Sequence, residues 1–410
     1  MASRKARSAA ALALALSLSA ALVLAAGQLG DYPSDAGPAL NALAHGHLGR
    51  FFELQPLMGL VSVVLRAPFV ALAHGTGASE LGAYQAGAFP CMLALALAGL
   101  ALAREAGRRG ASVPVQALIA LLVPANPMTV DTLRYGHPED LLATALCLAA
   151  VLAAMRGRGV LAAVALGLAI STKQWAIVAT LPVVLLAPVP RLRLLMIAGA
   201  LSVLFALPLA AGHPGTFATR AQSAANVTTS PPIGTTSVWW PLAWERPQQV
   251  FDGVSYTITA QRFLPRWLNG LTHPLIVLLA LLLPLALTRG RLSGVDPPRV
   301  ASMLALLFLL RSALDPVDIG YYHLPFVVSL FAVDVVAAPR RWPLHGLAGT
   351  ALFWLYFERV LDPSAPALSY VAYVGLAATA VAYLAMRAFR PELLARLTRV
   401  RVSKPSLAGT

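Results

Sequence analysis

Apolar runs long enough to cross a lipid bilayer recur along almost the whole chain. A membrane-spanning helix needs about 20 predominantly apolar residues, and runs of this kind extend from residues 9–26 to residues 368–386. Of the 410 residues, 58% are hydrophobic and only 12% are charged, whereas a soluble domain carries about 25% charged residues. The runs are too long and too uniformly apolar for barrel strands. The sequence therefore predicts an all-α polytopic membrane protein in which residues 1–410 form one integral membrane domain.

Short clusters of Arg and Lys between the apolar runs determine the predicted topology, because basic loops stay on the cytoplasmic side. These clusters lie near residues 104–109, 156–158, 191–193, 289–299, 340–341 and 387–404. They place both termini inside the cell, with about twelve crossings. The crossings are 9–26, 82–103, 113–128, 138–155, 160–171, 175–188, 194–211, 272–288, 300–314, 321–338, 344–360 and 368–386. Because the net charge of +14 resides in such clusters, nucleic acid is not an expected partner.

Two apolar runs near the N-terminus need separate treatment. The run at 9–26 exceeds the apolar region of about 7–15 residues in a signal peptide, so we predict an uncleaved first helix instead of the alternative, a cleaved leader. A full crossing by residues 57–73 would place the 104–109 cluster outside. That run also contains Arg66 and Pro68. We therefore predict interfacial or re-entrant helices within a first external loop at 29–81.

Polar clusters interrupt the apolar runs on the predicted non-cytoplasmic side. Charges near a bilayer usually line a cavity or a site, because burial in hydrocarbon is costly. Asp31 and Asp35 follow the first run directly. One interpretation is a solvated loop that ends a helix. The other is a general base at the membrane surface, which takes a proton from a hydroxyl during group transfer.

A second cluster occupies residues 134–140 at the outer end of a predicted crossing. Pro138, Glu139 and Asp140 suit the first turn of a helix, where proline is tolerated and carboxylates complement the positive helix end. Capping leaves Arg134 and His137 unexplained. These two side chains are candidates for binding a phosphate at the helix N-terminus.

Two further cations belong to the same predicted side. Lys173 lies in a polar break between two half-length apolar runs, and broken helices often line binding sites; the alternative is an outer turn whose lysine extends to the interface. Arg311 either pairs with Asp315 at i,i+4 or binds a lipid phosphate through its planar fork. Tyr322 and His323 complete this third outer cluster.

Residues 212–271 form the one long hydrophilic stretch that the sequence predicts. This predicted external loop contains Trp239, Trp240, Trp244 and Trp267. Tryptophan favours the membrane–water interface, so these residues are either an interfacial belt or part of a loop that covers a cavity and stacks on a sugar or a lipid. No P-loop or dinucleotide fingerprint occurs, so nothing in the sequence supports ATP-driven transport.

No set of residues has convincing metal-ligand spacing. His45 and His47 are two residues apart, and on a helix such side chains diverge. Cys91 and Cys147 both lie within apolar runs and are interpreted as core residues, with neither a disulfide framework nor a zinc motif. The sequence thus predicts no certain cofactor and leaves assistance by a divalent metal open.

Four passages together resemble glycosyltransferases of the GT-C fold that use polyprenyl-phosphate sugars, most of all glycosyltransferase family 87. The passages are the aspartate-bearing loop from Asp35 through Gly46 to Phe52, the Gly-His-Pro-Glu-Asp-Leu-Leu sequence at 136–142, the Gly-Leu-Ala run and lysine at 167–176, and the arginine and Tyr-Tyr-His-Leu-Pro elements at 311–325. Their order and spacing carry the resemblance. It implies a GT-C-like bundle with re-entrant or interfacial helices in the first external loop.

The resemblance also implies an activity, namely inverting transfer of mannose or another hexose or pentose from a polyprenyl-phosphate donor to a lipid or glycan acceptor. The implied general base is Asp35, by its distance to the Gly46 turn, with Asp31 second. The residues implied in substrate binding are Arg134, His137, Glu139, Asp140, Lys173, Arg311, Tyr322 and His323. The family more often has Gly-Gln-x-Asn where this chain has Gly-His-Pro-Glu, so the sugar and the acceptor stay undetermined.

The expected location is a bacterial plasma membrane with the active site facing outside, since the high Ala, Leu and Arg content is typical of a GC-rich bacterial genome. Two other classes of function remain. A lipid or small-molecule transporter or flippase would show an internal repeat and matching broken helices in its two halves, and neither is evident. A structural subunit without chemistry would require all three outer clusters to be ordinary loops.

Overall fold

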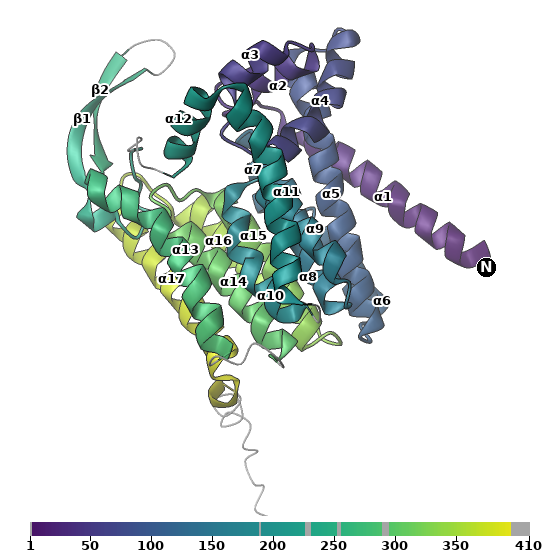
Figure 1. The fold of residues 1–410 in the computed structure, drawn as a ribbon. Coiled ribbons are helices and arrows are strands. Elements are labelled where there is room, and N and C mark those ends of the chain that lie inside the picture. The colour runs from purple at the N-terminus through teal and green to yellow at the C-terminus, as the bar shows by residue number, and fades with distance from the viewer. Residues whose placement is uncertain (1, 188–189, 226–230, 252–255, 289–294, 395–410) are drawn as a thin grey trace, which may run out of the picture.

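Helices dominate the computed structural model, which describes residues 2–187, 190–225, 231–251, 256–288 and 295–394 (Figure 1). Within these residues, eight helices are long and apolar enough to cross a membrane. They are Ala9–Ala26, Glu80–Arg108, Val113–Arg134, Pro138–Met155, Arg191–Gly212, Arg266–Thr288, Gly320–Ala337 and Pro366–Phe389. The chain is therefore a helical polytopic membrane protein, as its apolar runs predict. The predicted count of twelve crossings is not confirmed.

The other four predicted crossings correspond to helices that are shorter than a full span. A polar break at residues 171–173 separates two of them, because α9 ends before it and a 3-10 turn (Gln174–Ala179) follows it. The last of the four ends where the backbone widens into a π-helical turn at Tyr356–Val360. The four helices are α9 (Gly159–Ile170), α10 (Thr180–Leu186), α14 (Pro297–Ala313) and α16 (Leu344–Leu355).

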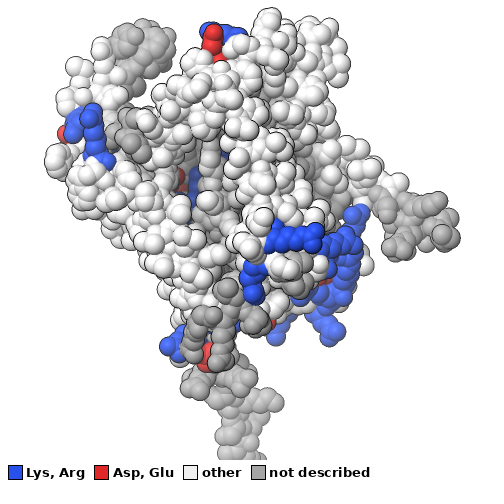
Figure 2. Space-filling view, viewed as in Figure 1, with Lys and Arg blue, Asp and Glu red and all other residues white. Residues whose placement is uncertain are grey.

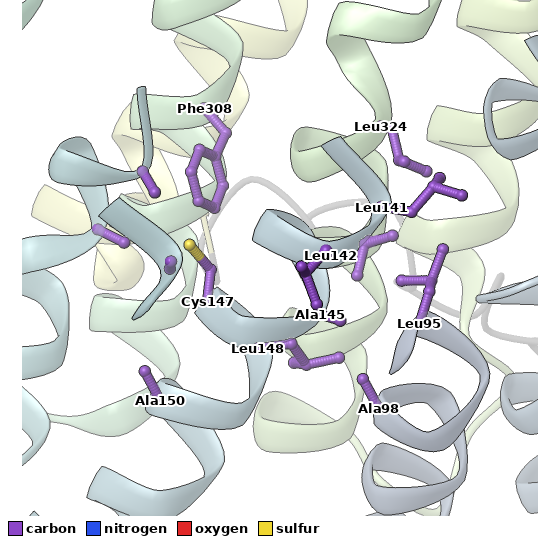
Figure 3. Close-up of a cluster of buried hydrophobic side chains, with 14 of the residues drawn as sticks. Leu95, Ala98, Leu141, Leu142, Ala145, Cys147, Leu148, Ala150, Phe308 and Leu324 are labelled. Atoms are coloured by element: carbon purple, nitrogen blue, oxygen red, sulfur yellow. The ribbon is translucent and has the colours of Figure 1, made fainter. Parts of the chain in front are cut away.

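The centre of the bundle is formed by α8 (Pro138–Met155) and α15 (Leu324–Ala337). Of the spanning window of α8, 83% is buried inside the protein, compared with 22% for α1 (Ala2–Ala26) and 17% for α11 (Arg191–Gly212). Figure 3 shows Leu141, Leu142 and Ala145 of α8 beside Leu95 of α5 (Glu80–Arg108). Helix α8 is apolar on nearly all sides because neighbouring helices surround it.

Short helices gather at one end of the bundle (Figure 1). They are α2 (Gly37–Ala44), α3 (Leu48–Leu54) and α4 (Leu60–Gly75) from the predicted first external loop, together with α12 (Pro214–Ala224). Helix α4 corresponds to the predicted non-crossing run at 57–73. It has 16 residues and packs against α5 and α2. A helix of this length is shorter than a membrane span requires, which agrees with the interfacial or re-entrant interpretation.

The segment at 212–271 contains strands as well as helices, so the prediction of an all-α chain needs correction there. Strands β1 (Trp244–Phe251) and β2 (Tyr256–Phe263) pair antiparallel, with Trp244 opposite Phe263. Alternating Thr and Ile residues in β2 suit a strand. The Trp239 indole nitrogen donates a hydrogen bond of 2.9 Å to the Leu314 carbonyl and ties this segment to the bundle. Helices α13 (Arg266–Thr288) and α17 (Pro366–Phe389) complete the fold.

Basic side chains gather mainly at the end opposite α2, α3 and α4 on the face shown in Figure 2. At the C-terminal end of α5, Glu105 binds Arg108, Arg109 and Arg156 at 3.4, 3.0 and 3.0 Å. This distribution is the one that the positive-inside rule gives for a cytoplasmic end. The sidedness itself remains a prediction.

Gly59, at the start of α4, packs against the polar break after α9. Its backbone N–H donates to the Thr172 carbonyl at 3.0 Å. A Cβ at position 59 would lie 1.8 Å from the Ser171 carbonyl oxygen, a separation that no side chain can occupy without moving one backbone or the other. The first external loop and the Lys173 break are thus held together by a contact that requires glycine.

We predict that Gly59→Ala lowers the melting temperature of the purified protein, because overpacking against rigid backbone costs about 1–3 kcal/mol. Thermal unfolding in detergent measures the change. The control is Gly75→Ala, at the end of the same helix, where a Cβ meets nothing within 4 Å. Equal melting temperatures for the two variants would contradict the assigned role of Gly59.

Candidate functional site

A cavity of about 980 Å³ lies between the Lys173 break, α11, α12, α13 and the loop at 315–322. Acidic and basic side chains are visible in a hollow on the face drawn in Figure 2. Hydrocarbon side chains from α11, α12 and α13 form much of its wall, including Phe205, Leu209, Phe217, Ile276 and Val277. The predicted site residues among its lining are Asp31, Asp35, His137, Lys173, Arg311 and Tyr322. The cavity is therefore amphipathic, with charged residues from several segments that are far apart in the sequence.

Two glycines bring Asp31 beside His137. Gly30 and Gly136 have positive φ angles of 53° and 86°, a conformation that glycine adopts without steric cost. A Cβ on Gly30 would lie 2.3 Å from the Tyr135 carbonyl carbon. The Asp31 N–H donates to the Tyr135 carbonyl at 3.0 Å. The two turns thus dock backbone to backbone, and residues about a hundred positions apart form one surface.

His137 bridges two carboxylates across this contact. Its Nε2 lies 3.3 Å from Asp31 Oδ2, and its Nδ1 lies 3.0 Å from Glu139 Oε1. Burial disfavours the charged ring, but the hydrogen bonds to Asp31 and Glu139 outweigh it and raise the pKa of His137 to about 9. The hydrogen bond from His137 lowers the pKa of Asp31. At neutral pH the ring is therefore an imidazolium with both N–H groups donated.

Glu139 is the most heavily paired side chain of the site. Beside His137, it accepts a hydrogen bond from Arg66 Nη1 at 3.2 Å and one from Lys173 Nζ at 2.9 Å. The side chains of Glu139 and Arg66 are both fully buried. The carboxylate is thus a structural counterion for three cations from three segments. The sequence predicts Glu139 as a helix-capping residue and, by resemblance, as a substrate-binding residue; it does not predict the role of a buried counterion.

Asp140 joins the same network from the next position of α8. Its Oδ1 accepts a hydrogen bond of 2.6 Å from the Trp175 indole nitrogen, and its Oδ2 lies 3.3 Å from Lys173 Nζ. Burial opposes the charge on Lys173, yet Asp140, Glu139 and Asp35 hold its pKa above the usual range. The lysine at the break is therefore a fixed cation at the edge of the cavity. Its side chain is only 18% exposed, so it does not extend freely into solvent.

Arg311 lies between two aromatic rings on another side of the cavity. Its guanidinium carbon is 4.3 Å from the centre of the Tyr322 ring and 5.6 Å from the centre of the Trp175 ring. Asp315 Oδ2 is 4.0 Å from Arg311 Nη2, which is long for a direct hydrogen bond. The predicted i,i+4 pair is thus present but loose. The guanidinium is positioned by stacking and keeps donors for an anion.

Asp35 faces the cavity between the first turn and the start of α4. Its Oδ1 accepts a long hydrogen bond of 3.4 Å from the Leu57 N–H. One ligand atom each of Asp35, His137 and Glu139 lies within 4.8 Å of the others. Such a group could hold a divalent ion, but the ion would have to displace the hydrogen bonds that Glu139 accepts from His137 and Lys173. The Lys173 ammonium already supplies positive charge at this point.

Four of the predicted site residues do not line the cavity. Glu139 and Asp140 belong to the buried network that holds Lys173. The other two, Arg134 and His323, lie elsewhere. Arg134 is an exposed residue at the end of α7 (Pro127–Arg134) and is not part of the cavity lining that contains His137. His323 is fully buried and packs against Phe353 and Phe357, with ring centres 4.6 and 5.3 Å away. Sequence position placed both beside cavity residues, but neighbours along a helical turn point in different directions.

Some residues of the site are not among the sequence predictions. Arg66 was identified only as an obstacle to a membrane crossing, although a buried arginine in an apolar run itself indicates a paired carboxylate. His273 lies 3.4 Å from Asp315 Oδ2, and both line the cavity. Arg220 of α12 also lines it and donates to the Leu54 carbonyl at 2.9 Å. Nothing in the local sequence around Arg220 indicates a site.

Comparison with known proteins gives no assignment. No protein-family model matches the chain, and searches of curated proteins and of solved structures find no match either.

We expect Glu139→Gln to reduce the free energy of unfolding by about 3–5 kcal/mol, the cost of removing one partner from a buried ion pair. Reversible unfolding in mixed detergent micelles measures it. Glu53→Gln is the control, because the Glu53–Arg50 pair is exposed and exposed pairs contribute about 0–1 kcal/mol. A loss no greater than that of the control would refute the central role of Glu139.

The stability of the protein should fall between neutral and alkaline pH because of His137. A free histidine titrates near 6.5, and in the folded protein the pKa of His137 is about 9. The imidazolium therefore stabilises the fold fully below about pH 6.5 and loses this contribution as the pH rises through about 9. Melting temperatures from pH 6 to 10 should decline more steeply for the wild type than for His137→Gln. Parallel curves would show that His137 is not the responsible group.

Proposed function

We propose that this protein is a membrane glycosyltransferase that moves a sugar from a polyprenyl-phosphate donor to a lipid or glycan acceptor on the non-cytoplasmic face. The observation that carries the proposal is the amphipathic cavity, in which three aspartates and the cations of Lys173, Arg220 and Arg311 meet a wall of hydrocarbon side chains. A lipid-linked sugar phosphate has the same division between an apolar tail and an anionic head. The resemblance of four sequence passages to family 87 supports the same activity.

The donor would lie with its isoprenoid tail against α11 and α13 and its phosphate near Arg311. The outer faces of both helices are apolar, with Val203 and Leu207 of α11 and Leu278 of α13 well exposed, as expected for contact with lipid. A guanidinium matches phosphate oxygens through paired N–H donors. Lys173 adds a second positive charge on the cavity wall. Fixed charges of this kind stabilise the negative charge that develops on a leaving phosphate.

Transfer would proceed by direct displacement with inversion. A carboxylate removes the proton from the acceptor hydroxyl, the hydroxyl oxygen forms a bond to the anomeric carbon, and the bond from that carbon to the phosphate oxygen breaks with its electron pair. Polyprenyl phosphate leaves, and the proton stays on the carboxylate until solvent takes it. The reaction balances without a metal, an oxidant or a reductant.

Asp35 is the favoured base and Asp31 is the second candidate. His137 is unsuitable, because both of its ring nitrogens donate to carboxylates and the imidazolium holds its proton. The hydrogen bond from His137 Nε2 to Asp31 lowers the pKa of Asp31. A carboxylate with a lowered pKa is a weaker base. Among the hydrogen bonds of the described residues, the Asp35 carboxylate accepts only the long one from the Leu57 N–H. A carboxylate so placed can accept a proton from a hydroxyl in the cavity.

Loss of the base should reduce the rate of sugar transfer by a factor of about 10²–10⁴. We therefore expect Asp35→Asn to abolish most labelling when membranes are supplied with radiolabelled polyprenyl-phosphate-mannose and a panel of related donors. Asp362→Asn, an exposed carboxylate that caps a turn through Ser364, is the matched control and should keep full activity. Full activity in Asp35→Asn combined with loss in Asp31→Asn would move the base to Asp31.

Full transfer by the double variant Asp31→Asn, Asp35→Asn would exclude both carboxylates as the base. Movement of labelled lipid across reconstituted vesicles, with no transfer from any donor of the panel, would instead support the alternative function of a lipid transporter or flippase. The same wild-type and Asp35→Asn preparations serve both assays, so the two functions are compared on identical protein.

A further inference from the structure

Three histidines form a cluster on the surface made by α2 and α4, apart from the cavity. The ring centre of His45 lies 5.0 Å from that of His74 and 6.1 Å from that of His47. Between His45 and His47, Gly46 has a φ of 75° and lies outside the helices. The sequence argument that the two side chains diverge assumed a continuous helix. The turn at Gly46 makes that argument wrong, because the rings are stacked at an interplanar angle of 21°.

One residue, Asn41 of α2, orients two of the three rings. His45 Nδ1 lies 2.8 Å from the Asn41 backbone oxygen, and His74 Nε2 lies 3.1 Å from the Asn41 side-chain oxygen. Because both partners are acceptors, each of these ring nitrogens must carry the hydrogen. The other nitrogen of each neutral ring, Nε2 of His45 and Nδ1 of His74, is then an unprotonated acceptor.

The two hydrogen bonds to Asn41 are a feature that metal-binding histidines share. A ligating imidazole almost always donates its second N–H to a carbonyl or carboxylate oxygen, which fixes the tautomer and the orientation of the ring. Here both donations are made before any ligand binds. The third ring, His47, belongs to an exposed residue, so it can rotate towards the other two. Imidazole ligands without thiolates or carboxylates favour Zn²⁺, Cu²⁺ or Ni²⁺ over Mg²⁺ or Ca²⁺.

We propose that His45, His47 and His74 bind a divalent transition metal, through Nε2 of His45, Nδ1 of His74 and a nitrogen of His47, with water in the remaining position. The site is distinct from the Asp35, His137 and Glu139 group and does not depend on the proposed transferase activity. The ion would connect the C-terminal end of α2 to the C-terminal end of α4. Helix α2 directly follows the loop that carries Asp31 and Asp35.

Tyr32 lies between the histidine cluster and the buried network of Arg66 and Glu139. The Tyr32 hydroxyl lies 3.5 Å from the Asn41 side-chain oxygen, and the Arg66 guanidinium lies 5.7 Å from the Tyr32 ring centre. Tyr32 itself is fully buried. Metal binding would therefore restrain the first external loop and stabilise the folded protein, since a ligand that binds only the folded state shifts unfolding by mass action.

The test is titration of the full-length protein, purified in detergent without a histidine tag, with Zn²⁺ under calorimetric detection. The expected result is one ion per chain and a Zn²⁺-dependent rise in melting temperature. Asn41→Ala should weaken binding by about 10–100-fold, the effect of removing an outer-shell partner, and His45→Ala combined with His74→Ala should abolish the single-site isotherm. His213→Ala, an exposed histidine that caps α12, should bind as the wild type does.

Cu²⁺ electron paramagnetic resonance provides an independent spectroscopic readout. The wild type should show nitrogen hyperfine couplings from two or three imidazoles, and the His45→Ala, His74→Ala variant should lose them. The proposal is overturned if Zn²⁺ binds the wild type no more tightly than it binds this double variant. It is also overturned if the couplings persist in the double variant, because the ion would then lie elsewhere.

Discussion

The arrangement of the site depends on one buried carboxylate, Glu139, near the start of the central helix. It faces Arg66 from α4, Lys173 from the break after α9, and His137 from the preceding turn. A lone carboxylate in such a position would be strongly destabilised, and so would each of the cations. Together they are tolerated only when all of these segments are in place. The network therefore specifies the relative positions of the segments that bring the cavity's polar residues together.

Close backbone contacts fix the positions of these segments relative to one another. Gly30 and Gly136 let two turns pack backbone to backbone, and Gly59 lets α4 begin against the Ser171 carbonyl. Each contact joins the first external loop to one of the later polar segments. Asp31, Asp35 and Lys173 are carried on the segments so joined. The apolar wall comes from α11 and α13, in whose spanning windows only 17% and 28% of the residues are buried. Polar residues thus meet an exposed apolar wall, the combination that the proposed lipid-linked donor would need.

Much of this structure could be predicted from the sequence, and the failures have physical causes. Apolar run length predicted the helices, and the polar break at Lys173 was located correctly because charge is costly in hydrocarbon. The number of crossings could not be predicted, since short helices such as α9 and α16 are as apolar as spanning ones. Six predicted site residues line the cavity. Glu139 and Asp140 lie in the buried network behind Lys173 instead, and Arg134 and His323 lie elsewhere because helical turns send neighbouring side chains in different directions. An arginine in an apolar run indicates a buried partner, but which carboxylate pairs with Arg66 depends on tertiary contacts. The stacking of His45 on His47 depends on the path of the chain through Gly46.

The proposed activity requires that the cavity between α11, α13 and the Lys173 break receives a lipid-linked phosphate. A cryo-electron microscopy structure of the protein with a polyprenyl-phosphate sugar tests this most directly. The account predicts phosphate density beside Arg311 and Lys173, the sugar ring near Asp35, and the isoprenoid chain along the apolar residues of α11 and α13. Lipid density on another face of the bundle, with the cavity filled only by solvent, would contradict it.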